Sequence, residues 1–79
     1  MKTAERLFGE EVKKVRALRG LTQEDLAREA DIHPTYVSQL ERGLKSPTLH
    51  IILSLARALE TSAVDLLGEV EKRVSKPRR

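Results

Sequence analysis

Signals that start and stop helices recur along this chain at short intervals, and they limit the folds open to it. Thr22 and Ser62 each precede an aspartate by three residues, which is the spacing of a capping box with Asp in place of the commoner Glu. Pro34 suits the first position of a helix, and Gly20 and Gly43 are typical of helix ends. The chain is therefore divided into segments of a few helical turns each.

Five helices are predicted from these signals and from apolar residues at helical spacing. We expect them at Ala4–Arg19, Gln23–Ala30, Pro34–Arg42, Leu49–Leu59 and Ala63–Leu67, and a frayed helical turn can follow Gly68. Several of these helices are too short to be stable alone, so each must pack on the others. With 79 residues, 39% of them hydrophobic, the chain can build one small domain. The predicted fold is all-α, a compact five-helix bundle.

The apolar residues of each predicted helix identify the face that we expect to be buried. In the first helix these residues are Leu7, Phe8, Val12, Val15 and Leu18. The second helix contributes Leu26 and Ala30, the third Val37, Leu40 and Leu44, and the fourth Leu49, Ile52, Leu53, Ala56 and Leu59. We expect these faces to meet in a common core.

Basic residues are concentrated at the end of the chain. Five of the last eight residues are Lys or Arg, whereas residues 1–71 carry ten basic and twelve acidic side chains. We therefore expect a folded domain over residues 1–71 and a disordered basic tail over residues 72–79. Because the domain is not a polycation, any binding of DNA must depend on a few basic groups placed on one face.

The sequence lacks features that membrane proteins, secreted proteins and cysteine-dependent enzymes need. It has no cysteine, no apolar run of the roughly 18 residues that a membrane span needs, and no signal peptide in its first residues. Its two histidines, His33 and His50, do not have metal-ligand spacing. No Ser/His/Asp arrangement and no glycine-rich phosphate loop is present. We expect a soluble cytoplasmic protein with no enzymatic activity, no cofactor or metal, no small-molecule substrate and no membrane partner.

The segment Gln23–Arg42 has the proportions of a helix-turn-helix, two short helices joined by a tight turn. At 100° per residue, Thr35, Gln39 and Arg42 point away from the apolar side of the second of these helices. Such side chains can bind base edges and phosphates in the major groove of DNA. An ordinary surface helix with a polar outer face has the same pattern, so the geometry alone leaves both interpretations open.

The chain also resembles a known family over residues 5–67. The stretch Gly20–Ala27 has the order Gly-Leu-Thr-Gln-Glu-Asp-Leu-Ala, and Tyr36–Gly43 has the order Tyr-Val-Ser-Gln-Leu-Glu-Arg-Gly. Together with Ser46–Leu49 and Leu55–Leu59, these stretches resemble the Cro/phage-repressor helix-turn-helix family of transcription regulators. The resemblance implies a lambda-repressor-like DNA-binding domain. In length the chain resembles both the controller proteins of restriction–modification systems and small phage-type repressors.

The resemblance assigns roles to individual residues. The residues expected to contact bases are Pro34, Thr35, Tyr36 and Gln39. It implies phosphate contacts for Gln23, Arg42 and Lys45, with a solvated charge as the alternative for Arg42 and Lys45. From their positions at the start and on the flank of the third helix, His33 and Ser38 are also expected to contact phosphates. For Tyr36 the alternative is a half-buried packing residue with an exposed hydroxyl. Arg16 and Glu41 match a family pair that we expect to form a structural ion pair between the first and third helices. The turn differs from relatives at Asp31, where glycine is frequent.

The expected partners are double-stranded DNA and a second copy of the chain. A homodimer would match a near-palindromic operator whose half-sites lie about one helical turn, ~34 Å, apart. The predicted dimer residues are Ile51, Leu55, Val64 and Leu67. Contact of RNA polymerase with the carboxylates of the second helix is a further prediction, although the helix dipole also explains acidic residues in a first turn.

Two other functions remain open at this point. One is a DNA-binding antitoxin that holds a toxin through its basic tail. The other is a helical protein-interaction module that has kept the fold without the DNA contacts.

Overall fold

The computed structural model describes residues 2–74, which form five α-helices and no strand. The helices are α1 (Ala4–Leu18), α2 (Gln23–Ala30), α3 (Pro34–Glu41), α4 (Leu49–Ala58) and α5 (Ala63–Val74). The predicted all-α fold is confirmed. None of these helices is long and apolar enough to cross a membrane.

Side-chain caps explain where the helices begin. The hydroxyl of Thr3 accepts the backbone N–H of Arg6 at 3.0 Å, and the hydroxyl of Thr48 accepts that of Ile51 at 3.2 Å. Thr22 and its partner aspartate form a complete capping box. These bonds satisfy backbone donors that have no partner within the helix. The caps at Thr22, Thr48 and Ser62 made the first residues of α2, α4 and α5 predictable from the sequence.

Helix α5 is longer than predicted, and the expected end at Leu67 is wrong. The helix continues through Gly68 to Val74 because Val70 is buried against the other helices. Arg73 donates to Glu10 of α1 at 3.1 Å, which holds the last turn. The predicted boundary between residues 71 and 72 therefore falls inside α5. Residues 75–79 of the predicted tail lie outside the described residues.

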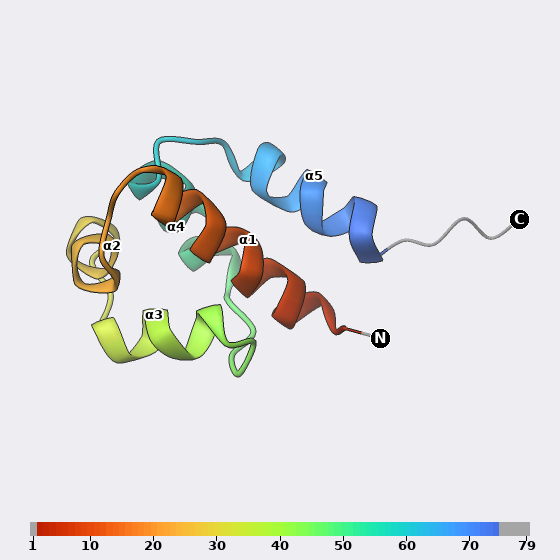
Figure 1. The fold of residues 1–79 in the computed structure, drawn as a ribbon, viewed down its shortest axis with the longest axis horizontal. Helices are drawn as coiled ribbons and strands as arrows, with labels where there is room; N and C mark the ends of the chain where they lie inside the picture. Colours follow the sequence, from red (N-terminus) through yellow and green to blue (C-terminus); the bar gives the residue numbers. More distant parts are fainter. Residues whose placement is uncertain (1, 75–79) are drawn as a thin grey trace, which may run out of the picture.

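The helices pack in pairs around one core. Helix α1 lies along α5 and across α3, while α2 packs against α3 and α4 at one end of the molecule (Figure 1). The buried apolar residues come from all five helices and are Leu7, Phe8, Val12, Leu26, Ala27, Ala30, Val37, Leu40, Leu55, Ala56, Leu59, Leu66 and Val70.

Four residues predicted to face inward are exposed instead: Leu18, Leu44, Leu49 and Leu53. Leu18 is the last residue of α1, beyond the part that packs on other helices, and Leu44 follows the end of α3. In α4, which packs on both α2 and α5, the buried stripe is carried by Leu55, Ala56 and Leu59. The periodicity of α4 identified Ala56 and Leu59 but missed Leu55, because the helix is apolar on more than one side.

The close approach of α1 to α3 depends on Gly9. A Cβ at this position would meet the carbonyl oxygen of Leu40 and would lie 2.7 Å from that of Glu41. Any side chain here would therefore push the two helices apart. This contact fixes α3 beneath α1, and α3 is the helix that the sequence predicts to face DNA.

Candidate nucleic-acid interface

The turn between α2 and α3 is three residues long and is held by backbone bonds. Asp31 has a left-handed conformation, with φ of 59°, which is the geometry that glycine adopts more readily. The N–H of Ile32 donates to the carbonyl of Ala27 at 2.9 Å, and this closes the end of α2. The departure from the family at Asp31 therefore leaves the turn intact.

His33 caps the first turn of α3. Its ring Nδ1 accepts the backbone N–H of Thr35 at 3.0 Å. Because Nδ1 is the acceptor, the neutral ring carries its hydrogen on Nε2. His33 is exposed at the protein surface. The phosphate contact predicted for His33 stays a prediction. The cap was not predicted, although the position of His33 directly before Pro34 was a usable signal.

Helix α3 presents a polar face to solvent and an apolar face to the core. Val37 and Leu40 are buried, whereas Thr35 and Arg42 are exposed. Pro34, Ser38 and Gln39 are partly exposed along the same helix.

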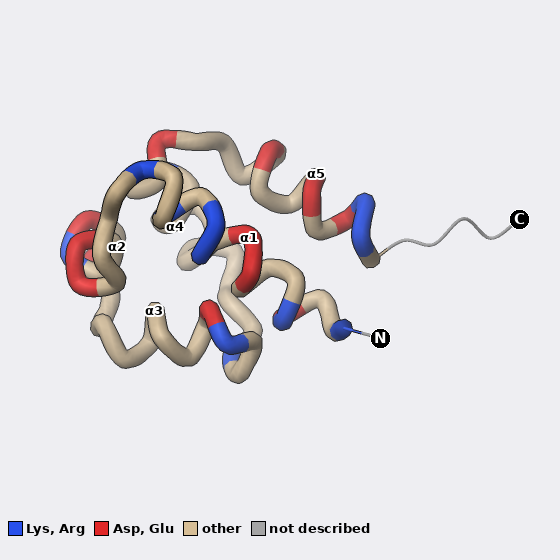
Figure 2. Tube along the Cα trace, in the orientation of Figure 1, with Lys and Arg blue, Asp and Glu red and all other residues tan. Residues whose placement is uncertain are grey.

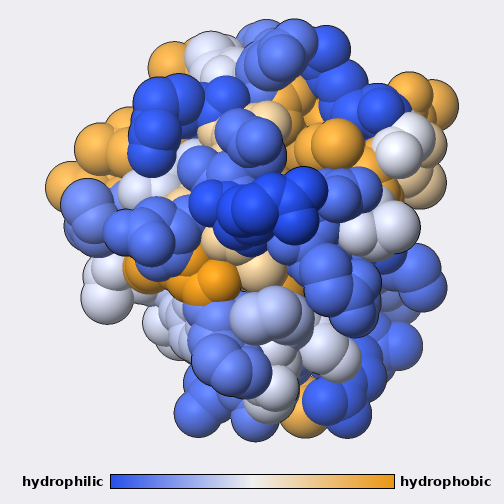
Figure 3. Space-filling model, turned by 90° about the vertical axis from the view of Figure 1, so that its left-hand side faces the viewer, coloured by the Kyte–Doolittle hydropathy of each residue, from blue (hydrophilic) through white to orange (hydrophobic). Residues whose placement is uncertain are grey.

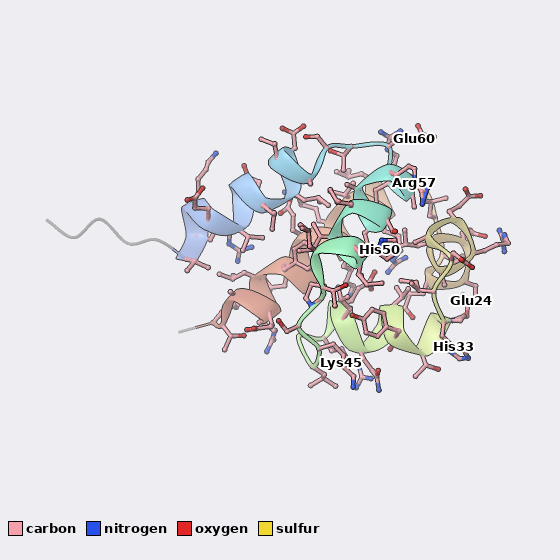
Figure 4. The ribbon with its side chains drawn as sticks, turned by 180° about the vertical axis from the view of Figure 1, so that it is seen from behind. Glu24, His33, Lys45, His50, Arg57 and Glu60 are labelled. Carbon is pink, nitrogen blue, oxygen red and sulfur yellow. The ribbon has the colours of Figure 1, made fainter. Side chains whose placement is uncertain are left out.

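Tyr36 and Lys45 were also predicted to contact DNA. Tyr36 is partly buried and packs against the core, as expected for its alternative role as a packing residue. Lys45 and His33 lie at the two ends of α3, along one edge of the molecule (Figure 4). Helix α3, which carries most of the residues predicted to contact bases and phosphates, lies on the side of the molecule away from α5 (Figure 4).

A buried carboxylate, Glu41, holds α3 to the rest of the molecule. Its Oε2 accepts the Nε of Arg16 at 2.6 Å, and its Oε1 accepts the Nη2 of Arg16 at 3.1 Å. The side chains of Glu41 and Arg16 are only 3% and 13% exposed. The hydrogen bond to Glu41 raises the pKa of the Arg16 guanidinium. The remaining amino group of Arg16 donates to the carbonyl of Leu21 at 2.8 Å.

Gln23 binds the same carboxylate. Its amide Nε2 donates to Oε1 of Glu41 at 2.9 Å, so Glu41 connects α1, α2 and α3. An amide nitrogen has two hydrogens, and one of them is used in this bond. Contact of Gln23 with a phosphate stays a prediction and would use the second hydrogen. No signal in the sequence pointed to the bond between Gln23 and Glu41.

Acidic residues gather on α2, whereas basic positions occur on α1 and just beyond α3 (Figure 2). Within α2, the carboxylate of Asp25 accepts the N–H of Thr22 at 3.0 Å and an Nη2 hydrogen of Arg28 at 2.9 Å. The bond from the Thr22 N–H, followed by that from Arg28, holds the pKa of Asp25 below its usual value. Seen from the end that carries α2, the centre of the molecular surface is hydrophilic (Figure 3). Asp25 thus has a local structural role, and a contact with RNA polymerase stays a prediction.

The residues predicted for the dimer surface do not all reach the surface. Leu55 is 1% exposed and belongs to the core of a single copy, so its assignment to the interface is wrong. Ile51 is partly buried, whereas Val64 and Leu67 are exposed. Leu49 and Leu53 of α4, which were predicted to lie in the core, are 70% and 52% exposed.

Comparison with known proteins identifies the family of the chain. The family described as helix-turn-helix matches residues 12–66. The control protein C.BamHI of Bacillus amyloliquefaciens is 40% identical over 62 residues, which are 77% of this chain and 76% of that protein.

Two solved structures have the same fold. The restriction–modification controller protein C.AhdI of Aeromonas hydrophila has a TM-score of 0.76 at 36% identity, over 77% of this chain and 92% of that one. The clp gene regulator ClgR of C. glutamicum has a TM-score of 0.88 at 28% identity, over 98% of this chain and 100% of that one.

Proposed function

Because the chain belongs to the helix-turn-helix family of DNA-binding transcription regulators, we propose that it binds a near-palindromic operator as a homodimer, with α3 in the major groove. Members of this family are not enzymes. The observation that carries the proposal is the polar outer face of α3, which is held in place by buried contacts on its other side.

The outer face of α3 offers groups that suit base edges and phosphates. The amide of Gln39 can pair with adenine through two hydrogen bonds, and Thr35 can bond to a base or contact a thymine methyl group. Arg42 and Lys45, at the end of α3, carry charges suited to phosphates. Nε of Arg42 lies 3.3 Å from the carbonyl oxygen of Ser38, which directs the guanidinium along the helix.

A dimer is supported by the apolar surface of the last two helices. Leu49, Leu53, Val64 and Leu67 are all exposed there. Beside them lies an apolar groove of about 160 Å³ lined in part by Ile52, Leu67 and Val70. Exposed apolar groups of this kind mark contact surfaces when they are contiguous. We assign this surface to the second copy of the chain.

The biological role that fits best is control of a restriction–modification system. The similarity to C.BamHI and C.AhdI supports this role, since both are described as control or controller proteins.

Selection of bound sequences from a random duplex library, at near-physiological salt, tests the proposal. We expect enrichment of an inverted repeat with half-sites about one turn apart. Within that repeat, Gln39→Ala should relax the preference at one base pair, and Arg42→Ala should weaken binding to all sequences about equally. An absence of any enriched motif, with weak binding that vanishes as salt rises, would contradict the proposal.

A further inference from the structure

A group of basic residues lies beside the C-terminal end of α3. These residues line an open cleft of about 400 Å³ between α1 and the C-terminal end of α3. Its lining residues are Arg6, Glu10, Lys13, Glu41 and Arg42. Figure 2 shows basic positions along α1 and just after α3.

Two glycines fix the cleft by bringing backbones into contact. Gly9 lies against the last carbonyls of α3, as described above. Gly43 has a φ of 78°, and a Cβ added to it would lie 2.8 Å from the Cα of Arg6. Arg6 and Lys13 are seven residues apart, so they project from the same side of α1. The two cations of α1 are therefore held at a set position relative to Arg42.

The carboxylates in the cleft are already neutralised. Glu41 is paired with Arg16. Glu10 accepts Lys2 at 2.8 Å and Arg73 at 3.1 Å, and the bond from Lys2 is the largest cause that lowers the pKa of Glu10. Nε of Arg6 is 3.4 Å from the same carboxylate.

The cations that remain give the cleft a positive excess. Within residues 2–74, neither Lys13 nor Arg42 forms an ion pair. The side chain of Arg6 is 57% exposed despite its contact with Glu10. The cleft therefore favours an anion over a cation or a neutral group.

We propose that Arg6 and Lys13, together with Arg42, bind a phosphate of the DNA backbone, so that α1 contacts the duplex alongside α3. This inference rests on the proposed function, because α3 in the major groove brings the strand that borders the groove toward the end of α3. Such contacts position a protein on the duplex without reading its sequence. Arg6 and Lys13 are therefore determinants of affinity and register rather than of base preference.

The test compares Arg6→Gln, Lys13→Gln and the double variant with the unaltered protein. Lys14→Gln is the matched control, because Lys14 is the adjacent α1 lysine and its ammonium lies 3.3 Å from the buried Glu11. Dissociation constants would be measured by fluorescence anisotropy for the selected operator and for a scrambled duplex, over a series of salt concentrations. Thermal melts followed by circular dichroism would verify that each variant is folded.

We expect the double variant to bind both duplexes roughly tenfold more weakly, the loss of about one charge-assisted hydrogen bond. The slope of log K against log salt should become shallower by about one, which corresponds to one phosphate contact. Lys14→Gln should keep the slope of the unaltered protein. Arg6→Lys, which keeps the positive charge, should keep most of the salt slope of the unaltered protein.

An unchanged slope in the double variant would overturn the inference, and so would binding by Arg6→Lys as weak as that of Arg6→Gln. A cleft that holds only free phosphate would likewise leave the slope unchanged. In each of these cases, operator binding by the unaltered protein would leave the proposed function standing. Failure of the unaltered protein to bind either duplex would instead contradict the proposed function itself.

Discussion

At the scale of single residues, Glu41 organises the face that we expect to meet DNA. Its carboxylate is almost fully buried and binds Arg16 of α1 and Gln23 of α2. The family resemblance predicted the pair with Arg16, since it compares positions along the chain. The bond from Gln23 depends on how α2 is tilted against α3, and no local pattern in the sequence records that tilt.

Glu41→Ala should destabilise the protein by about 3–5 kcal/mol, because it leaves the guanidinium of Arg16 buried without its carboxylate. Glu41→Gln should cost less, since the amide keeps one acceptor. Urea unfolding followed by circular dichroism measures both. Glu71→Ala is the control, at an exposed position of α5 where we expect a change within about 0.5 kcal/mol. A loss from Glu41→Ala no larger than that of the control would contradict the role assigned to this carboxylate.

At the scale of helices, the sequence predicts beginnings better than ends. A cap such as that of Thr22 or Thr48 is formed within four residues, so local sequence determines it. The length of α5 depends instead on partners far along the chain, among them Glu10. The buried stripe of α4 has the same dependence, since its neighbours select which apolar side turns inward.

The two glycines inside helices give a matched prediction. Gly9→Ala should destabilise the protein by about 1–3 kcal/mol or more, because the added methyl group meets the carbonyls at the end of α3. Gly68→Ala should stabilise it by up to about 1 kcal/mol, since nothing lies within 4 Å of a Cβ there and alanine favours helix. Thermal and urea unfolding of the two variants would show changes of opposite sign. A stabilising Gly9→Ala would refute the close approach of α1 and α3.

At the scale of the whole molecule, assembly was the hardest property to predict. The apolar residues of the last two helices predicted a dimer interface there, but Leu55 was wrongly included in it. Helical spacing alone cannot separate residues that a single copy buries, such as Leu55, from those it leaves exposed, such as Leu53. That division depends on the packing of α4 against α2 and α5.

Leu53→Glu should convert the proposed dimer to a monomer, because it places a charge on the apolar surface of α4. The single copy should remain folded, since Leu53 is 52% exposed. Sedimentation equilibrium measures the mass, and a melting temperature that no longer rises with protein concentration gives a second readout. Leu18→Glu, at a 79% exposed position of α1, should leave the mass unchanged. A dimer of unchanged affinity in the Leu53 variant would move the interface elsewhere.

The carboxylate of Glu10 has a mechanical consequence. It binds Lys2 and Arg73, which lie near the two ends of the described chain, and α1 and α5 run side by side with those ends at the same end of the molecule (Figure 1). A force applied between the ends would load the contacts of Glu10 first and then peel α5 from α1 one turn at a time. Resistance to stretching would thus be low, because the helices unzip in sequence instead of sliding past each other together.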